Sequence, residues 1–141
     1  MRYICDAGGD RTWFGIETEA EAEAESTLMA HAVARYWRRA RAEAIACYEP
    51  APSTPAIERD IGLKAHIART MPRFLTLRDG EGAGLATAML PPEGVGETDF
   101  RTIVVGPENA DPYDAHDDAI ALLGKRLGLK LPRERCYPYG R

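Results

Sequence analysis

Four arginines fall within two helical turns in the segment Arg35-Tyr-Trp-Arg-Arg-Ala-Arg41. In a helix, Trp37 would join an apolar stripe while the arginines point away from it or flank it. Guanidinium groups bind carboxylates and phosphates through paired hydrogen bonds, and they are enriched at protein interfaces. This spacing predicts a partner-binding face made of Arg35, Arg38, Arg39 and Arg41. The alternative is a solvated helix face near a helix C-terminus, where cations are favoured without any partner.

The same segment belongs to a strongly bipolar stretch. Residues 17–25 carry five glutamates and residues 35–41 carry four arginines. Thr18 with Glu21 forms the pattern of a capping box, and the alanines and glutamates that follow favour helix, so one helix is expected over residues 19–48. At ~1.5 Å per residue it would be about 45 Å long. Two copies in antiparallel arrangement would place acid against base, so this helix predicts a homodimer.

No histidine or cysteine pattern indicates a metal site. His31, His66 and His116 are never three or four residues apart, and we expect them on solvated surfaces. Cys5, Cys47 and Cys136 include no Cys-x-x-Cys pair, and their odd number fits reduced thiols. Cys136 is flanked by Arg133 and Arg135, which would favour its thiolate if they lay close to it.

Two further segments resemble binding motifs only superficially. Residues 79–84, Asp-Gly-Glu-Gly-Ala-Gly, are rich in glycine like a phosphate-binding loop, but a strand follows instead of a helix and the two acids would repel phosphate. A hairpin turn is expected there. The acidic residues at the start of the last helix do not have the spacing of a calcium loop, so no metal is expected; they are Asp111, Asp114, Asp117 and Asp118.

Around these residues the sequence predicts an α+β fold. Short β-branched or aromatic runs predict strands over residues 2–7, 12–17, 73–78, 85–90 and 100–105. Helices are expected over residues 19–48, 55–70 and 112–127, and residues 129–141 form an irregular tail. In the helix of residues 55–70 one face is apolar; it consists of Ile57, Ile61, Ala65 and Ala68. The order ββααβββα predicts an antiparallel sheet of about five strands in two layers, covered by three helices, within one domain spanning residues 1–141.

Composition limits the possible functions. The 141 residues carry a formal net charge of −4, which disfavours a general nucleic-acid or membrane binder. No run approaches the roughly 18 apolar residues that cross a bilayer, and the N-terminus lacks a signal-peptide core. We therefore expect a cytoplasmic protein. The high content of alanine, arginine, glycine and proline is typical of a GC-rich bacterial genome.

The preferred hypothesis is a small binding or adaptor protein without catalytic activity and without a cofactor, whose arginine-rich helix face contacts a protein partner. No nucleophile–base pair, metal-ligand spacing or cofactor loop is visible in the sequence, although catalytic groups can also meet only in space. One alternative is an accessory protein that contacts nucleic acid through the same arginines. The other is a small enzyme with a pocket lined by polar groups such as His31, Asp60, His66 or Tyr113.

Overall fold

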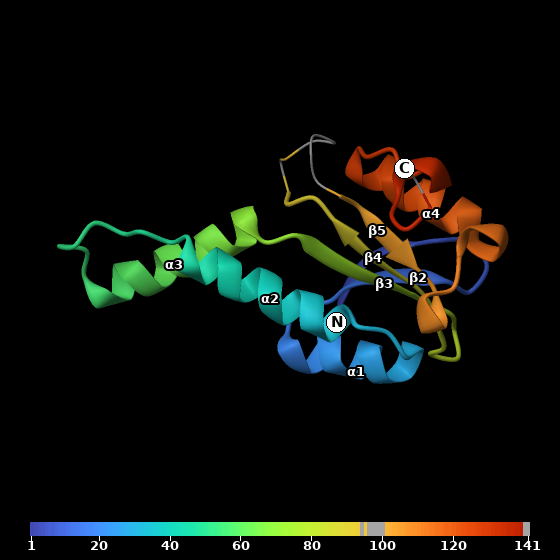
Figure 1. The fold of residues 1–141 in the computed structure, drawn as a ribbon, viewed down its shortest axis with the longest axis horizontal. Helices are drawn as coiled ribbons and strands as arrows, with labels where there is room; N and C mark the ends of the chain where they lie inside the picture. The colour runs from blue at the N-terminus through green and yellow to red at the C-terminus, as the bar shows by residue number, and fades with distance from the viewer. Residues whose placement is uncertain (94, 96–100, 140–141) are drawn as a thin grey trace.

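A computed structural model describes residues 1–93, 95 and 101–139 of the chain (Figure 1). The strands are β1 (Arg2–Asp6), β2 (Thr12–Gly15), β3 (Arg73–Arg78), β4 (Gly84–Leu90) and β5 (Ile103–Val105). The α-helices are α1 (Glu19–Met29), α2 (Val33–Ala46), α3 (Ala56–Thr70) and α4 (Tyr113–Leu127). Two short 3-10 helices are η1 (Pro107–Asn109) and η2 (Arg133–Arg135). The first residue of the predicted last strand, Phe100, lies outside the described residues.

The five strands form one antiparallel sheet, as the sequence predicted, and their order in it is β1-β2-β3-β4-β5. Gly8 and Gly9 have positive φ angles of 85° and 60° in the turn that joins β1 to β2. The glycine-rich residues 79–84 form a hairpin turn, as predicted. In this turn the Asp79 carboxylate accepts hydrogen bonds from the backbone N–H groups of Glu81 and Ala83. Helices α1, α2 and α3 all lie between β2 and β3 in sequence, although these two strands are neighbours in the sheet.

Helices cover both faces of this sheet, so the molecule has three layers where two were predicted. On one face Trp13, Leu75 and Leu77 form a cluster with Ile120 and Leu123 of α4. On the other face a cluster joins residues of α1 and α2 to the sheet; it consists of Ile16, Ala22, Val33, Ala34, Trp37 and Phe74. The central strands explain the difference, because β3 buries four consecutive residues that point alternately to the two faces.

The predicted helix of residues 19–48 is wrong in one respect, because it is broken into α1 and α2. Ala30 has φ 51° and ψ 51°, the left-handed conformation, and α2 begins three residues later. The Ser26 hydroxyl accepts a hydrogen bond of 2.8 Å from the backbone N–H of Ala34, which satisfies a donor in the first turn of α2. The break lets α2 turn back along α1, so both helices pack on the same face of the sheet.

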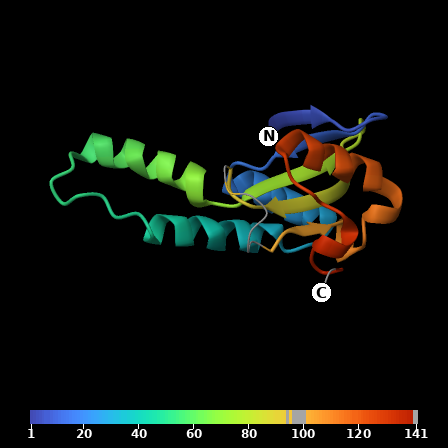
Figure 2. The same cartoon turned by 90° about the horizontal axis from the view of Figure 1, so that it is seen from above.

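Helices α2 and α3 continue past the sheet as a helical arm, which projects from the body of the molecule (Figure 2). The two helices pack against each other along this arm. The Tyr48 ring lies 5.3 Å from the His66 ring, and the Tyr48 hydroxyl contacts the position that a side chain at Gly62 would occupy. Helix α3 contains no buried residue.

The C-terminal segment after α4 is mostly irregular, as predicted, but it packs on the sheet. Leu129, Leu131 and Cys136 are buried in the same cluster as α4. Tyr137 forms a parallel bridge with Ile103 beside β5. The segment therefore covers part of the α4 face. In the described part of the chain no helix combines the length and the apolar character needed to span a bilayer.

We predict that Ala30→Gly stabilises the protein. A left-handed residue with a Cβ costs roughly 1–2 kcal/mol, partly offset by the greater entropy of glycine in the unfolded chain, so a net gain of about 0.5–1 kcal/mol is expected. Ala30→Val, a β-branched residue at the same positive φ, should destabilise the protein. Urea unfolding of the three proteins measures both effects. Equal stability of the valine variant and the wild type would contradict a left-handed residue at this position.

Candidate functional site

The arginines of the predicted face all lie on α2 and are exposed, but they point in different directions and have different partners. Arg38 donates a 3.0 Å hydrogen bond to Glu23 of α1, and its Nε lies 3.9 Å from the Glu19 carboxylate. Arg39 pairs with Glu43 one turn further along α2, at 3.2 Å. The acidic and basic segments that were expected to meet between two copies thus meet within one chain. The continuous rod on which the predicted 19–48 homodimer depends is not formed.

Arg41 differs from the other three because it alone among them lines a basic groove. The groove has a volume of about 630 Å³ and lies at the end of the sheet where α2 leaves the body and α3 returns to it. Five basic residues from five different elements line it, and they are Arg2, Arg41, Lys64, Arg73 and Arg126. Two acidic residues, Glu17 and Glu93, line it as well. The groove therefore has an excess of positive charge in a molecule whose net charge is −4.

Two of these cations are neutralised by carboxylates, and a third is held by a backbone carbonyl. Arg2 pairs with Glu17 at 2.6 Å, and Lys64 pairs with Asp60 at 3.4 Å. Arg73 donates a 2.8 Å hydrogen bond to the Pro91 carbonyl, and burial lowers its pKa, opposed by the nearby Glu93 carboxylate.

Two cations of the groove keep their full charge available. Within the part of the chain that the structure describes, Arg41 and Arg126 have no ion-pair partner. The apolar side chains of Trp37, Met71 and Phe74 line the same groove. The sequence singled out Arg41 through its arginine-rich neighbourhood. It carried no signal for Arg126, because tertiary structure alone brings that residue close.

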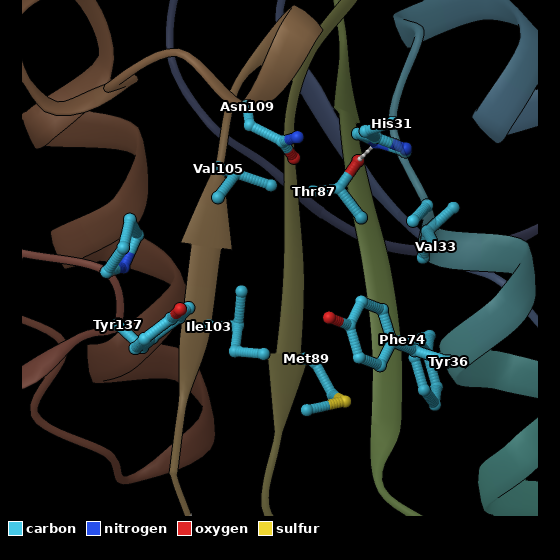
Figure 3. A pocket seen from close by; sticks show the side chains of 12 residues that line it. His31, Val33, Tyr36, Phe74, Thr87, Met89, Ile103, Val105, Asn109 and Tyr137 are labelled. Atoms are coloured by element: carbon cyan, nitrogen blue, oxygen red, sulfur yellow. Dashed lines mark hydrogen bonds between the residues drawn. The ribbon is translucent and has the colours of Figure 1, made fainter.

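A second concave site lies on the α2 face of the sheet (Figure 3). It is a pocket of about 290 Å³ between the start of α2, strands β3 to β5 and the C-terminal segment. Most of its lining is apolar, as Val33, Met89 and Val105 show. His31 and Thr87 lie at one end, where His31 Nε2 is 2.8 Å from Thr87 Oγ1.

His31 was expected on a solvated surface, and the structure corrects this prediction. The residue follows the left-handed Ala30, which directs it toward the sheet, and burial lowers the pKa of its imidazole. A Thr–His pair can in principle act as nucleophile and base. Catalysis would also need a group that orients the base, yet among the described residues His31 Nδ1 is buried without a hydrogen-bond partner. His31 and Thr87 thus form a hydrogen-bonded pair at one end of a mostly apolar pocket.

A buried ion pair lies beside this pocket, under α1. Glu25 is fully buried, accepts a 2.6 Å hydrogen bond from the Thr76 hydroxyl and pairs with Arg78. Met29 lies between this ion pair and the His31–Thr87 pair, since its sulfur is 3.2 Å from Thr87 Oγ1 and 4.0 Å from Thr76 Oγ1. This pair was not predictable from sequence, because Glu25 is the last of five glutamates at alternating positions. In the structure only Glu25 among them is buried.

The residues of the enzyme alternative are not brought together. His31 lines the pocket, whereas His66 stacks against Tyr48 in the arm and Asp60 lies on the exposed surface of α3. Tyr113 is buried on the opposite face of the sheet, where its hydroxyl donates a 2.9 Å hydrogen bond to the Leu131 carbonyl. These positions provide no shared cleft for general acid–base chemistry.

Acidic residues around the start of α4 bind groups of their own chain. Asp111 accepts a hydrogen bond from the backbone N–H of Tyr113 and pairs with Arg133 at 2.5 Å. Asp118 forms a two-point ion pair with Arg11, which lowers the pKa of its carboxyl to about 2. Across residues 1–93, 95 and 101–139, no group of three or more His, Cys, Asp or Glu side chains is placed to hold a metal ion.

Two of the cysteines differ in their exposure. Cys47 is exposed, because α2 ends at Ala46 in the projecting arm. Cys136 is buried, and burial raises the pKa of its thiol. Its neighbouring arginines therefore do not make it a reactive thiolate.

We predict that His31 makes stability depend on pH. Its folded pKa lies below the ordinary value of 6.5, so the unfolded chain binds a proton first as the pH falls. The free energy of unfolding should therefore decrease below pH 6.5, until the pH passes the folded pKa. One such group gives a slope of at most about 1.4 kcal/mol per pH unit. His31→Gln keeps a group able to bond Thr87 and should flatten this slope in urea unfolding.

His116 provides the second variant for this test. Burial, followed by the nearby Arg11, lowers its pKa as well, so it contributes a slope of the same sign. Unfolding of His31→Gln, His116→Gln and the double variant separates the two contributions. A His31→Gln slope identical to that of the wild type would show that His31 does not titrate differently on folding.

Comparisons of the chain with protein-family models, with curated protein sequences and with solved structures find no match.

Proposed function

We propose that this chain is a non-catalytic binding protein that contacts an acidic segment of a partner protein through the groove around Arg41. The observation that carries the proposal is the convergence of basic side chains from five elements on one groove. Arginine binds carboxylates in a defined geometry, and a concave surface lined by one sign of charge attracts the opposite sign. Arg41 and Arg126 are the two residues we expect to bind the partner.

The lining of the groove favours a protein over a nucleic acid. Trp37, Met71 and Phe74 provide apolar surface beside the arginines, and this combination is typical of protein interfaces. A polyanion would also be repelled by the overall charge of −4, whereas a short acidic segment interacts mainly with the local positive field. Within the groove, Glu17 and Glu93 limit the positive charge further.

The arginines of α2 differ in whether their own chain already binds their charge. Arg38 and Arg39 already have carboxylate partners on their own chain, which reduces what they gain from an external one. Arg35 is exposed near the start of α2 and does not line the groove. These residues therefore serve as matched controls, because they carry the same charge on the same helix.

We predict that Arg41→Glu and Arg126→Glu each weaken binding of the partner by at least about tenfold, because each reverses a charge that faces the groove. Arg35→Glu and Arg39→Glu should leave the affinity nearly unchanged. The measurement is capture of the tagged full-length chain and each variant from its native lysate after nuclease treatment, followed by titration of the purified partner at several salt concentrations. Circular dichroism checks that each variant is folded.

The possible outcomes separate the hypotheses. A partner lost with Arg41→Glu and Arg126→Glu but retained with Arg39→Glu supports the groove. Equal loss with all four variants would instead support the helix face predicted from the sequence, and loss after nuclease treatment would support a nucleic acid. Either of these two results would overturn the proposal.

A further inference from the structure

The apolar face of α3 is left exposed by the residues that the structure describes. Ile57 and Ile61 are 72% and 62% exposed, and Ala65 and Ala68 on the same face are exposed as well. The opposite face of α3 packs against α2, with half-buried Leu63 and Ile67. We name the exposed face the α3 stripe, which consists of Ile57, Ile61, Ala65 and Ala68. Helix α3 belongs to the projecting arm (Figure 2), and Ala68 at the C-terminal end of the stripe also lines the groove around Arg41.

Charged residues flank the α3 stripe in an ordered way. At 100° per residue, Glu58 and Arg69 lie on one flank, and Asp60 and Lys64 lie on the other. On each flank the acid belongs to the N-terminal half of the helix and the base to the C-terminal half. Asp60 and Lys64 are one turn apart and pair within the chain at 3.4 Å. The structure gives no such partner to Glu58 or Arg69 within its described residues.

This arrangement matches a second copy of itself in antiparallel orientation. With a two-fold axis at the level of residue 63, Ile61 lies opposite Ala65 of the other copy, and Ile57 lies within one residue of the level of Ala68. Large side chains thus face small ones, as close helix packing requires. The axis also keeps each flank beside the same flank of the other copy, so Glu58 comes beside Arg69. Parallel pairing would place like charges together.

We propose that two copies of this chain associate through their α3 stripes as an antiparallel, two-fold symmetric dimer. The partner is a second copy because the sizes of the apolar side chains and the signs of the flanking charges both reverse about residue 63. A surface for an unrelated partner does not need this symmetry. The surface differs from the helix of residues 19–48, and Arg41 and Arg126 take no part in it. A single helix pair is small beside the roughly 1,200–2,000 Å² of stable complexes, so we expect dissociation at micromolar concentrations.

Sedimentation velocity over micromolar to submillimolar concentrations of the full chain tests the proposal. The wild type should change from monomer to dimer as its concentration rises. Ile61→Asp should abolish dimerisation, because it places a charge in the apolar contact. Leu122→Asp is the matched control, since Leu122 is 40% exposed on α4, away from the arm. It should leave the dimer intact.

Charge reversal gives a test that does not disturb the apolar contact. Glu58→Arg leaves only positive charge on its flank, and Arg69→Glu leaves only negative charge, so each variant alone should dimerise at least about tenfold more weakly. An equimolar mixture of the two should dimerise like the wild type, since both flank contacts are then attractive. The double variant should also recover. Arg41→Glu should not change the dimer, which separates this proposal from the proposed function.

A monomeric wild type at every concentration would overturn the proposal. Dimerisation that persists in Ile61→Asp would also overturn it, by placing the contact elsewhere. Single charge variants that weaken the dimer with no recovery in the mixture would rule out the antiparallel register. Recovery in the mixture, by contrast, is specific to Glu58 of one copy lying beside Arg69 of the other.

Discussion

The reversal of the chain at residues 30–32 determines where the other functional elements lie. Helix α1 lies on the sheet with Ala22, Glu25 and Met29 inward. Because Ala30 turns the chain out of the helix and Ser26 caps the next one, α2 runs back beside α1 and then beyond the sheet. The same turn directs His31 into the pocket. A straight helix would have lost these placements together, including the position of Arg41 at the groove.

The buried Glu25–Arg78 pair specifies how α1 lies on the sheet. A buried carboxylate is costly unless its partners are complete, and here Thr76 and Arg78 supply them. Sliding α1 by one turn would bury Glu21 or Met29 against these groups and leave Arg78 without its carboxylate. The pair therefore contributes more to the register of the helix than to net stability. Since α2 packs on α1, this register is passed on to the arm.

Local sequence signals predicted the sheet well. Strand β3 was predicted with the bounds observed, and the turns at Gly8–Gly9 and at 79–84 followed from glycine and aspartate chemistry. The break at Ala30 could not be predicted, because alanine is the best helix former and left-handed alanine is rare. The sequence also left open which face of a helix packs against the core. The apolar face of residues 57–68 was recognised, but periodicity does not tell whether a face meets the core or solvent.

The candidate sites were predictable only in part, for a related reason. An arginine cluster on one helix is visible in sequence, and Arg41 belongs to it. The groove also needs Arg2, Arg73 and Arg126, which are separated by most of the chain and meet because the strand ends and α4 come together. Likewise, the contact between His31 and Thr87 joins residues 56 positions apart. Sequence spacing carries information on neighbours within an element, and such contacts between elements depend on the fold.

The position of the three helices between adjacent strands has a consequence for how this architecture could vary. The sheet is a simple meander in which β2 pairs with β3, so its hydrogen bonding does not depend on the length of the segment that joins them. Doubling a connecting segment adds only about 0.6 kcal/mol of loop-closure entropy. Whole turns could therefore be added to or removed from the far end of α2 and α3 at little cost to folding. The reach of the arm is thus a property that can change while the body that carries it stays the same.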